Sequence, residues 1–88
     1  MAETTVEIIN KAGLHARAAA KLAELSASFG CDIRVGHEKM VDGKSILSLM
    51  MLAAVKGTTI TVITDGPDEE RALQAIVALV NNRFDESE

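Results

Sequence analysis

Four segments of the chain are rich in β-branched residues or alternate apolar with polar residues. Such patterns are typical of strands that are buried on one side. They predict strands at residues 4–9, 31–36, 39–41 and 58–64. The third segment follows the second closely, so we expect these two strands to pair as a hairpin.

Three other segments repeat apolar residues at every third or fourth position, which is the spacing of an amphipathic helix. The first begins at Ala16, the second covers residues 45–55, and the third runs from Pro67 to Phe84. Proline suits the first position of a helix, which supports the start of the third one. Residues 85–88 are expected to form a frayed tail.

The resulting order of elements is β-α-β-β-α-β-α. This order indicates an α+β fold in which helices pack on one face of a largely antiparallel sheet. The length of 88 residues suits a single domain spanning residues 1–88. The pattern alone leaves open whether the topology is ferredoxin-like or that of a close relative.

Composition narrows the class of protein. With 48% apolar and 25% charged residues, the chain resembles a globular domain. A net charge of −4 and the lack of basic clusters argue against a nucleic-acid partner. We find no secretion signal and no apolar run that suits a membrane span. Its one cysteine, Cys31, cannot form an internal disulfide. We therefore expect a cytoplasmic protein that is not inserted in a membrane and has proteins or small molecules as partners.

His15 and Arg17 lie at the predicted start of the first helix. Backbone N–H groups there lack acceptors within the helix, and the helix dipole is positive, so the place suits an anion. Arg17 adds a permanent charge, and the pair fits a phosphoryl group carried on His15 itself. A surface histidine beside a solvated arginine would give the same spacing, and spacing alone leaves both readings open. His37 is the only other histidine, so no metal site is predicted, and no cofactor is expected.

The segment 46–54 has apolar residues on more than one side of its predicted helix. Leucine and methionine can fill a core, but in so small a domain some of them should remain exposed for protein docking. Ser45 precedes this segment and is a natural N-cap. A phosphoserine at Ser45 would also suit the start of the helix, and its charge beside a docking surface would act as an off-switch.

The motif GLHAR at residues 13–17, with KSI at 44–46 and AAVKG at 53–57, resembles a known family. This is the histidine-containing phosphocarrier (HPr) family of the bacterial phosphoenolpyruvate-dependent phosphotransferase system, and the resemblance covers essentially the whole chain. The segments near the two ends look particularly like its nitrogen-related form, NPr. The family usually has proline after H-A-R, where this chain has Ala18. Alanine is an excellent helix former, so we expect the helix to survive.

The resemblance implies an open-faced β-sandwich, with a four-stranded antiparallel sheet and three helices on one face. It also implies that His15 accepts a phosphoryl group on Nδ1 from phosphorylated Enzyme I. His15 would pass that group to a IIA-type protein, in sugar uptake or in nitrogen-related regulation. Arg17 and the backbone N–H groups of Ala16 and Arg17 would hold the phosphate. The expected docking residues are Ile46, Leu47 and Met50, and Ser45 aligns with a serine that a kinase/phosphorylase modifies in many members.

The resemblance makes the protein a stoichiometric carrier rather than an enzyme, and we expect a monomer. No acidic residue lies near His15 in the sequence. We expect none beside the ring, because a carboxylate there would repel the phosphoryl group. The alternative function is a regulatory binding module that acts through phospho-Ser45 and the adjacent apolar patch without phosphoryl transfer. The presence of His15 weighs against that alternative.

Overall fold

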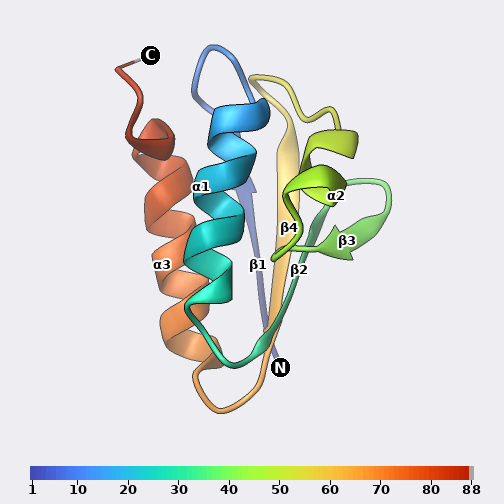
Figure 1. Ribbon diagram of the computed structural model, residues 1–88, viewed down its shortest axis with the longest axis vertical. Helices are drawn as coiled ribbons and strands as arrows, with labels where there is room; N and C mark the ends of the chain where they lie inside the picture. Colours follow the sequence, from blue (N-terminus) through green and yellow to red (C-terminus); the bar gives the residue numbers. More distant parts are fainter. Residues whose placement is uncertain (88) are drawn as a thin grey trace.

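The protein is a sheet covered by helices on one of its two faces (Figure 1). The computed structural model describes residues 1–87. The strands are β1 (Ala2–Glu7), β2 (Asp32–Gly36), β3 (Met40–Asp42) and β4 (Thr59–Asp65). Each strand is antiparallel to its neighbours, in the order β1-β4-β2-β3. The predicted α+β fold and its four-stranded antiparallel sheet are confirmed.

Three helices form the second layer. They are α1 (Ala16–Ala27), α2 (Ile46–Met51) and α3 (Glu69–Asn81), and a short 3-10 turn, η1 (Arg83–Asp85), follows. α1 lies beside α3 along the sheet, and the shorter α2 packs against α1 (Figure 1). α1 forms with Ala18 in its first turn, so the helix survives the replacement of the family's usual proline. Within residues 1–87, no helix is both long enough and apolar enough to cross a membrane.

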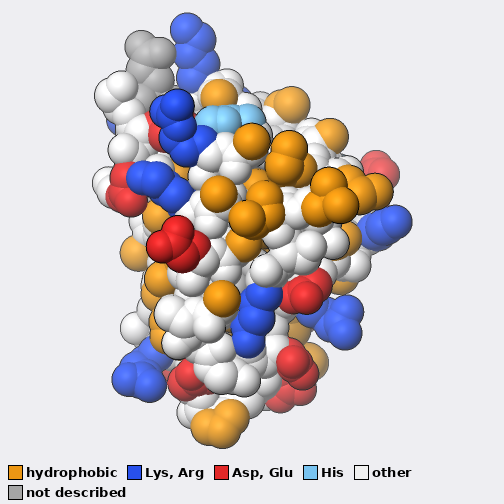
Figure 2. All heavy atoms as spheres, in the orientation of Figure 1, with side chains coloured by type: hydrophobic (Ala, Val, Ile, Leu, Met, Phe, Trp, Pro, Cys, Tyr) orange, Lys and Arg blue, Asp and Glu red, His pale blue; other side chains and the backbone are white. Residues whose placement is uncertain are grey.

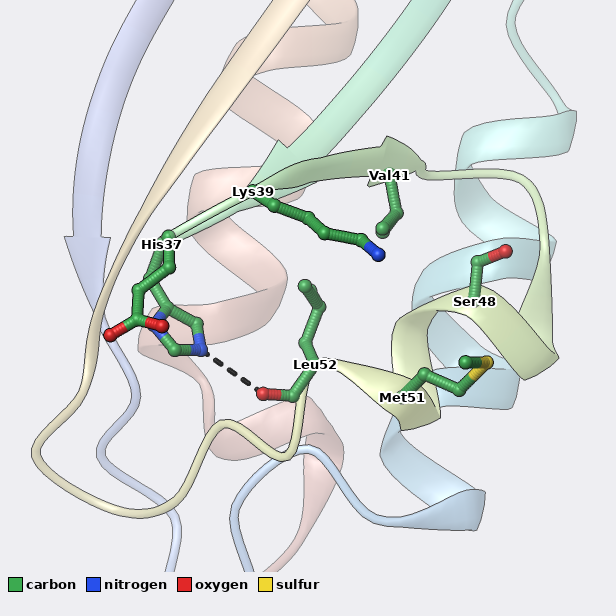
Figure 3. A pocket seen from close by; sticks show the side chains of 7 residues that line it. His37, Lys39, Val41, Ser48, Met51 and Leu52 are labelled. Carbon is green, nitrogen blue, oxygen red and sulfur yellow. Dashed lines mark hydrogen bonds between the residues drawn. The ribbon is translucent and has the colours of Figure 1, made fainter.

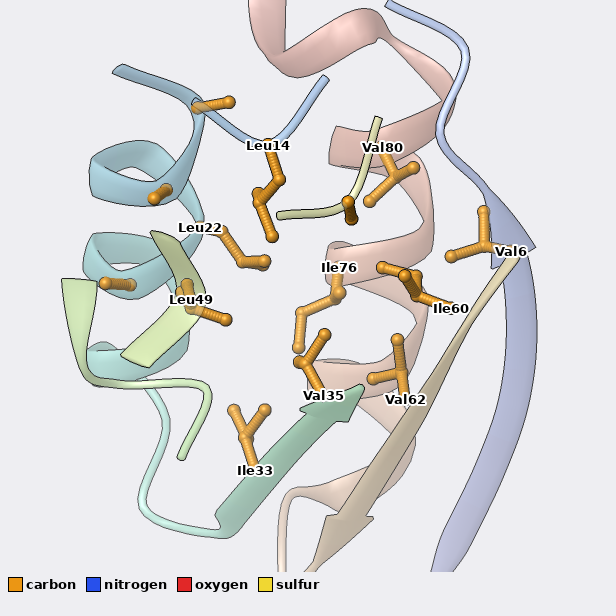
Figure 4. Close-up of a cluster of buried hydrophobic side chains, with 14 of the residues drawn as sticks. Val6, Leu14, Leu22, Ile33, Val35, Leu49, Ile60, Val62, Ile76 and Val80 are labelled. Atoms are coloured by element: carbon orange, nitrogen blue, oxygen red, sulfur yellow. The ribbon is translucent and has the colours of Figure 1, made fainter. Parts of the chain in front are cut away.

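The core between the two layers is aliphatic (Figure 4). β4 pairs with both β1 and β2, and its alternating residues Ile60 and Val62 are fully buried. The helices contribute the fully buried Leu22 from α1, Leu49 from α2 and Ile76 from α3. Complete burial of such a side chain contributes about 1.5–3 kcal/mol. This layer therefore fixes how α1 and α2 lie on the sheet.

α2 ends at Met51, four residues before the predicted end of its helix at residue 55. Ala53 adopts a left-handed conformation (φ 52°), which cannot continue a right-handed helix. Beyond it, the carbonyl of Ala54 accepts the N–H of Leu14 at 2.8 Å. The chain leaves the helix to make this contact with a distant loop, which periodicity along the sequence does not reveal.

α3 begins at Glu69, so Pro67 lies before the helix and not at its first position as predicted. Asp68 occupies the N-cap position, but its carboxylate does not cap its own helix. It accepts the N–H groups of Gly30 at 2.9 Å and Cys31 at 3.0 Å. Asp68 therefore holds the connection between α1 and β2, and α3 starts at the next residue, Glu69.

The chain after α3 differs from the expected frayed tail at Asp85 and Glu86. Asp85 belongs to η1, and the Glu86 side chain is only 16% exposed. Phe84 between them and α3 is fully buried, and its burial holds this segment against the molecule. Residue 88 lies outside the described residues.

Candidate functional site

The loop between β1 and α1 sets the position of His15. Asn10 is fully buried and donates from Nδ2 to the carbonyl of Gly13 at 2.8 Å, which closes the turn. Gly13 has a positive φ of 68°, and a Cβ there would come within 2.6 Å of the Ala54 carbonyl oxygen. Glycine is therefore required at this position for the left-handed backbone and for the close approach. The hydrogen bond from Asn10 and the close approach to Ala54 therefore fix the loop immediately before His15.

His15 is the N-cap of α1. Its backbone is extended (φ −83°, ψ −176°), and its carbonyl accepts the N–H of Ala19 at 2.8 Å. Its ring nitrogen Nδ1 accepts the backbone N–H of Arg17 at 3.3 Å. The imidazole therefore takes the role that Ser, Thr or Asp has at most helix starts. This contact holds Nδ1 next to the first N–H groups of the helix.

The other ring nitrogen of His15 faces a carboxylate. Nε2 lies 2.7 Å from Oε2 of Glu86. A carboxylate can only accept a hydrogen bond, and a backbone N–H can only donate one. Both contacts therefore assign the proton to Nε2 and the lone pair to Nδ1, where it accepts the Arg17 N–H. The expectation that no acidic group lies beside His15 is wrong, because the fold brings this residue from 71 positions away.

Glu86 is itself held in place. Its Oε1 accepts the Asn10 amide at 2.9 Å, while Oε2 faces His15. The hydrogen bond from Asn10 lowers the pKa of the Glu86 carboxyl, partial burial acts in the opposite direction, and His15 and Arg17 lower the pKa further. Glu86 is thus an ionised carboxylate bound on the side of the ring away from Nδ1. This geometry limits its repulsion of an anion at Nδ1.

A left-handed turn places Glu86 beside the ring. Arg83, Phe84 and Asp85 have φ values of 56°, 53° and 64°. Each such conformation costs a residue other than glycine about 1–2 kcal/mol. Burial of the Phe84 side chain offsets part of this cost. Hydrogen bonds from the Asn82 amide to Asp85 (2.7 Å) and from Lys21 to Asp85 (3.4 Å) also hold the turn.

Arg17 lies at the edge of a shallow depression next to His15. The same depression is lined by two further cations, Lys11 and Lys21, and by the carboxylates of Asp85 and Glu86, of which Asp85 pairs with Lys21 at 3.4 Å. Cations therefore outnumber carboxylates there by three to two, although the net charge of the chain is −4. An anionic group brought to Nδ1 would therefore meet positive charge at the helix start and on its rim.

The predicted docking residues lie on α2, which packs against α1. Ile46 is 47% exposed, Leu47 69% and Met50 40%, whereas Leu49 on the same helix is fully buried. Met51 and Val55 extend this apolar surface and are 73% and 64% exposed. Figure 2 shows apolar side chains gathered over α2, beside basic side chains near the start of α1. We call the surface of residues 46, 47, 50, 51 and 55 the α2 patch.

Comparisons with known proteins agree on one family. The model for the PTS HPr component phosphorylation site matches residues 2–82. The chain belongs to the HPr family. It is 55% identical to the phosphocarrier protein HPr of Pseudomonas aeruginosa over 85 residues, which cover 94% of each chain. It is 48% identical to the phosphocarrier protein NPr of Shewanella violacea over 86 residues, which cover 97% of this chain and 94% of the other. A crystal structure of HPr from Thermoanaerobacter tengcongensis, 39% identical, matches with a TM-score of 0.95 and complete coverage of both chains.

Ser45 of this HPr-family chain lies at the edge of the α2 patch. It is the N-cap of α2, as predicted, and its Oγ accepts the N–H of Ser48 at 3.3 Å. Its side chain is half-buried beside the exposed Ile46. The structure therefore places Ser45 next to the predicted docking residues, on a different helix from His15 and Arg17.

A separate hollow lies between α2 and the turn that joins β2 to β3 (Figure 3). His37 points into it and bonds the carbonyl of Leu52 through Nε2 at 3.0 Å. None of the predicted site residues lines this hollow. His15 instead lies at the surface beside an open depression, an arrangement that suits contact with another protein. Within residues 1–87, no three His, Cys, Asp or Glu side chains are grouped as metal ligands.

Sequence reasoning found His15 and Arg17 in this HPr-family site but missed Asn10 and Glu86. Asn10 is of a residue type common in turns, so the sequence gives no sign of its complete burial or of its contact with Glu86. Glu86 has no local signal at all, because it reaches the site through the left-handed turn at residues 83–85.

Proposed function

We propose that this protein carries a phosphoryl group on Nδ1 of His15, which it accepts from the phosphohistidine of Enzyme I and passes to a IIA-type protein. The observation that carries the proposal is the pair of hydrogen bonds on the ring. They leave Nδ1 as the nitrogen with a lone pair, at the start of a twelve-residue helix. Membership of the HPr family supports the same chemistry.

Transfer begins when the Nδ1 lone pair attacks the phosphorus of the donor phosphohistidine. The N–P bond of the donor breaks, and its electron pair returns to the donor ring. The proton on Nε2 of His15 stays where it is, so this step needs no proton transfer. Onward transfer is the same displacement, with Nδ1 as the leaving atom and the partner's nucleophile as the attacking one.

The phosphoryl oxygens would be held by the backbone N–H groups of Ala16 and Arg17 and by the Arg17 guanidinium. The N–H that now bonds Nδ1 can bond a phosphoryl oxygen once Nδ1 is phosphorylated. A helix start contributes about 0.3–1 kcal/mol to holding a charge. A hydrogen bond to a charged group contributes about 1.5–3 kcal/mol. These modest terms suit a group that is held briefly and then released.

Partners would dock on the α2 patch, chiefly at Ile46, Leu47 and Met50. Exposed apolar side chains of this kind mark protein contacts in small domains, and they lie beside α1, which carries His15. Cations outnumber carboxylates in the depression next to His15, and this excess of positive charge would favour partners with acidic surfaces.

The role is that of a stoichiometric carrier, active as a monomer in the cytoplasm. Phosphorylation of Ser45 by a kinase/phosphorylase would place a dianion at the edge of the docking surface and weaken docking. The two ends of the chain look like NPr, which favours the nitrogen-related branch. The rival assignment is sugar uptake, and the identity of the IIA acceptor decides between them.

The test is incubation with Enzyme I, phosphoenolpyruvate and Mg²⁺, followed by mass spectrometry. We expect a gain of one acid-labile phosphoryl group in the native protein and none in His15→Ala. His37→Ala is the matched control, because His37 is exposed and lies outside the site. Labelling of His15→Ala, or no labelling of the native protein, would contradict the proposal. Offering sugar-type and nitrogen-type IIA proteins to the labelled carrier then identifies the branch.

A further inference from the structure

The Glu86 carboxylate binds the side of the His15 ring that the phosphoryl group does not use. We propose that Glu86 is a positioning residue for phosphoryl transfer. It keeps the ring proton on Nε2 and stabilises the positive charge that the ring acquires when Nδ1 is phosphorylated. This inference rests on the proposed carrier function.

The carboxylate is fixed by a contact on each oxygen. Oε1 accepts the Asn10 amide at 2.9 Å, and Oε2 lies 2.7 Å from Nε2 of His15. Asn10 is fully buried, and its amide also bonds the Gly13 carbonyl at 2.8 Å, so it cannot move away easily. Arg17 also favours the charged form of the Glu86 carboxylate. The carboxylate is thus ionised, oriented and aimed at one atom of the ring.

Without Glu86, little in the site would determine which ring nitrogen carries the proton. Among residues 1–87, the remaining hydrogen bond to the ring is that from the Arg17 N–H to Nδ1, which at 3.3 Å is longer than an ordinary N–H hydrogen bond. A ring with its proton on Nδ1 has no lone pair there and cannot attack phosphorus. The short contact to Glu86 therefore selects the reactive form of His15.

Glu86 also affects the phosphoryl-transfer step. When Nδ1 forms its bond to phosphorus while Nε2 keeps its proton, the ring becomes a cation. A carboxylate hydrogen-bonded to Nε2 stabilises that cation, as the aspartate behind the histidine does in serine proteases. When the phosphoryl group leaves, the N–P electron pair returns to Nδ1 and the ring becomes neutral again. Glu86 accepts no proton at any stage.

A purely structural role would be to fasten the C-terminal segment to α1. Other contacts already do this, because Phe84 is fully buried and Asp85 bonds both Asn82 and Lys21. Glu86→Gln should therefore leave the fold intact. The contacts to Asn10 and His15 fall on different oxygens of Glu86, and a glutamine has an acceptor oxygen at only one of these two positions. If the glutamine NH₂ group faced Asn10, two donors would meet. If it faced His15, Nε2 would have to accept a hydrogen bond, and the ring proton would move to Nδ1.

The experiment compares Glu86→Gln with Glu24→Gln, which makes the same change at an exposed position of α1. The first measurement is the ¹⁵N spectrum of the unphosphorylated His15 ring. We expect the Nε2–H form in the native protein and in Glu24→Gln, and a shift toward the Nδ1–H form in Glu86→Gln. The second measurement is the rate of phosphoryl transfer from Enzyme I. We expect it to fall at least about ten-fold in Glu86→Gln and by less than about two-fold in Glu24→Gln.

An unchanged ring form or an unchanged rate in Glu86→Gln would overturn the proposal. Equal slowing in Glu24→Gln would also overturn it, because the effect would then belong to the overall charge of the molecule. A failure of the carrier function looks different, since the native protein itself would then take no phosphoryl group. The spectrum of the unphosphorylated ring would still report whether Glu86 selects its form.

Discussion

The two ring nitrogens of His15 depend on very different parts of the chain. Nδ1 bonds the N–H of a residue two positions away, whereas Nε2 meets Glu86, 71 positions away. The first contact follows from a histidine at the start of a helix and could be predicted from the sequence. The contact with Glu86 could not be predicted. It depends on left-handed backbone at residues 83–85, where the sequence has no glycine to indicate such a conformation.

Arg17 should affect transfer far more than folding. We expect Arg17→Ala to slow phosphoryl transfer about ten- to a hundred-fold, because one charged contact to the phosphate is lost. Its side chain is exposed, so the free energy of unfolding should change by less than about 0.5 kcal/mol. Transfer kinetics and urea unfolding measure the two effects.

The control for this prediction is Arg34→Ala, which removes an exposed arginine from β2. It should change neither the rate nor the stability. A loss of stability in Arg17→Ala that matches its loss of rate would make Arg17 a structural residue.

At the scale of elements, apolar periodicity predicted the number, type and order of helices and strands. Periodicity predicted the wrong boundary where a contact with a distant part of the chain sets the end or the start of a helix. α2 stops early because the chain turns left-handed at Ala53 and Ala54 bonds Leu14. α3 starts late because Asp68 bonds Gly30 and Cys31. Such contacts depend on the packed layers and are not encoded in the spacing of nearby residues.

Asp68 should make the stability of the fold depend on pH. Its hydrogen bond from Gly30 lowers the pKa of its carboxyl, and Cys31 adds to the effect. The pKa in the folded state is then below that in the unfolded state. The stabilisation is complete above the ordinary aspartate range and is lost as the pH falls through the lowered value.

Urea unfolding of native protein and Asp68→Asn at several pH values tests this. The difference in free energy of unfolding should be largest near neutral pH and should shrink below about pH 4. Asp32→Asn, an exposed change on β2, should follow the native protein throughout. A difference that is constant with pH would show that the Asp68 charge is not the cause.

Ser45 allows a charge to be added to α2 without loss of its N-cap. Aspartate and asparagine both cap helices well. We expect Ser45→Asp to raise the KM for the carrier in the Enzyme I reaction about three-fold or more, because the charge lies beside the apolar α2 patch. Ser45→Asn should leave the KM near the native value. Equal KM values in the two variants would rule out the off-switch.

At the scale of the whole molecule, the groups assigned to function lie on two adjoining helices and the segments that meet them. His15 and Arg17 lie at the start of α1, and Glu86 follows η1. The α2 patch covers α2, which packs against α1, and Val55 shortly after it. Cations line the depression beside His15, although the chain is acidic overall. The sequence predicted this grouping through its family resemblance, whereas the exposure of Met51 and Val55 required the structure.

The α2 patch should govern partner binding rather than chemistry. We expect Ile46→Asp to raise the KM for the carrier at least about ten-fold, because a charge replaces apolar contact area at the centre of the proposed interface. The kcat should change little. Ala78→Asp adds the same charge at an exposed position of α3 and should leave both parameters unchanged. A fall in kcat without a change in KM would place Ile46 in the transfer step instead.

The six-residue α2 has one fully buried side chain, Leu49, whereas α1 has five buried residues along twelve. Local opening of α2 should therefore require less free energy than opening of α1. Its amide hydrogens should exchange with solvent deuterium sooner than those of α1, and Leu49→Ala should accelerate them further. A surface on such a lightly anchored helix, with flexible methionines, can adjust to differently shaped partners. One carrier could in this way fit both the protein that loads it and the protein that unloads it.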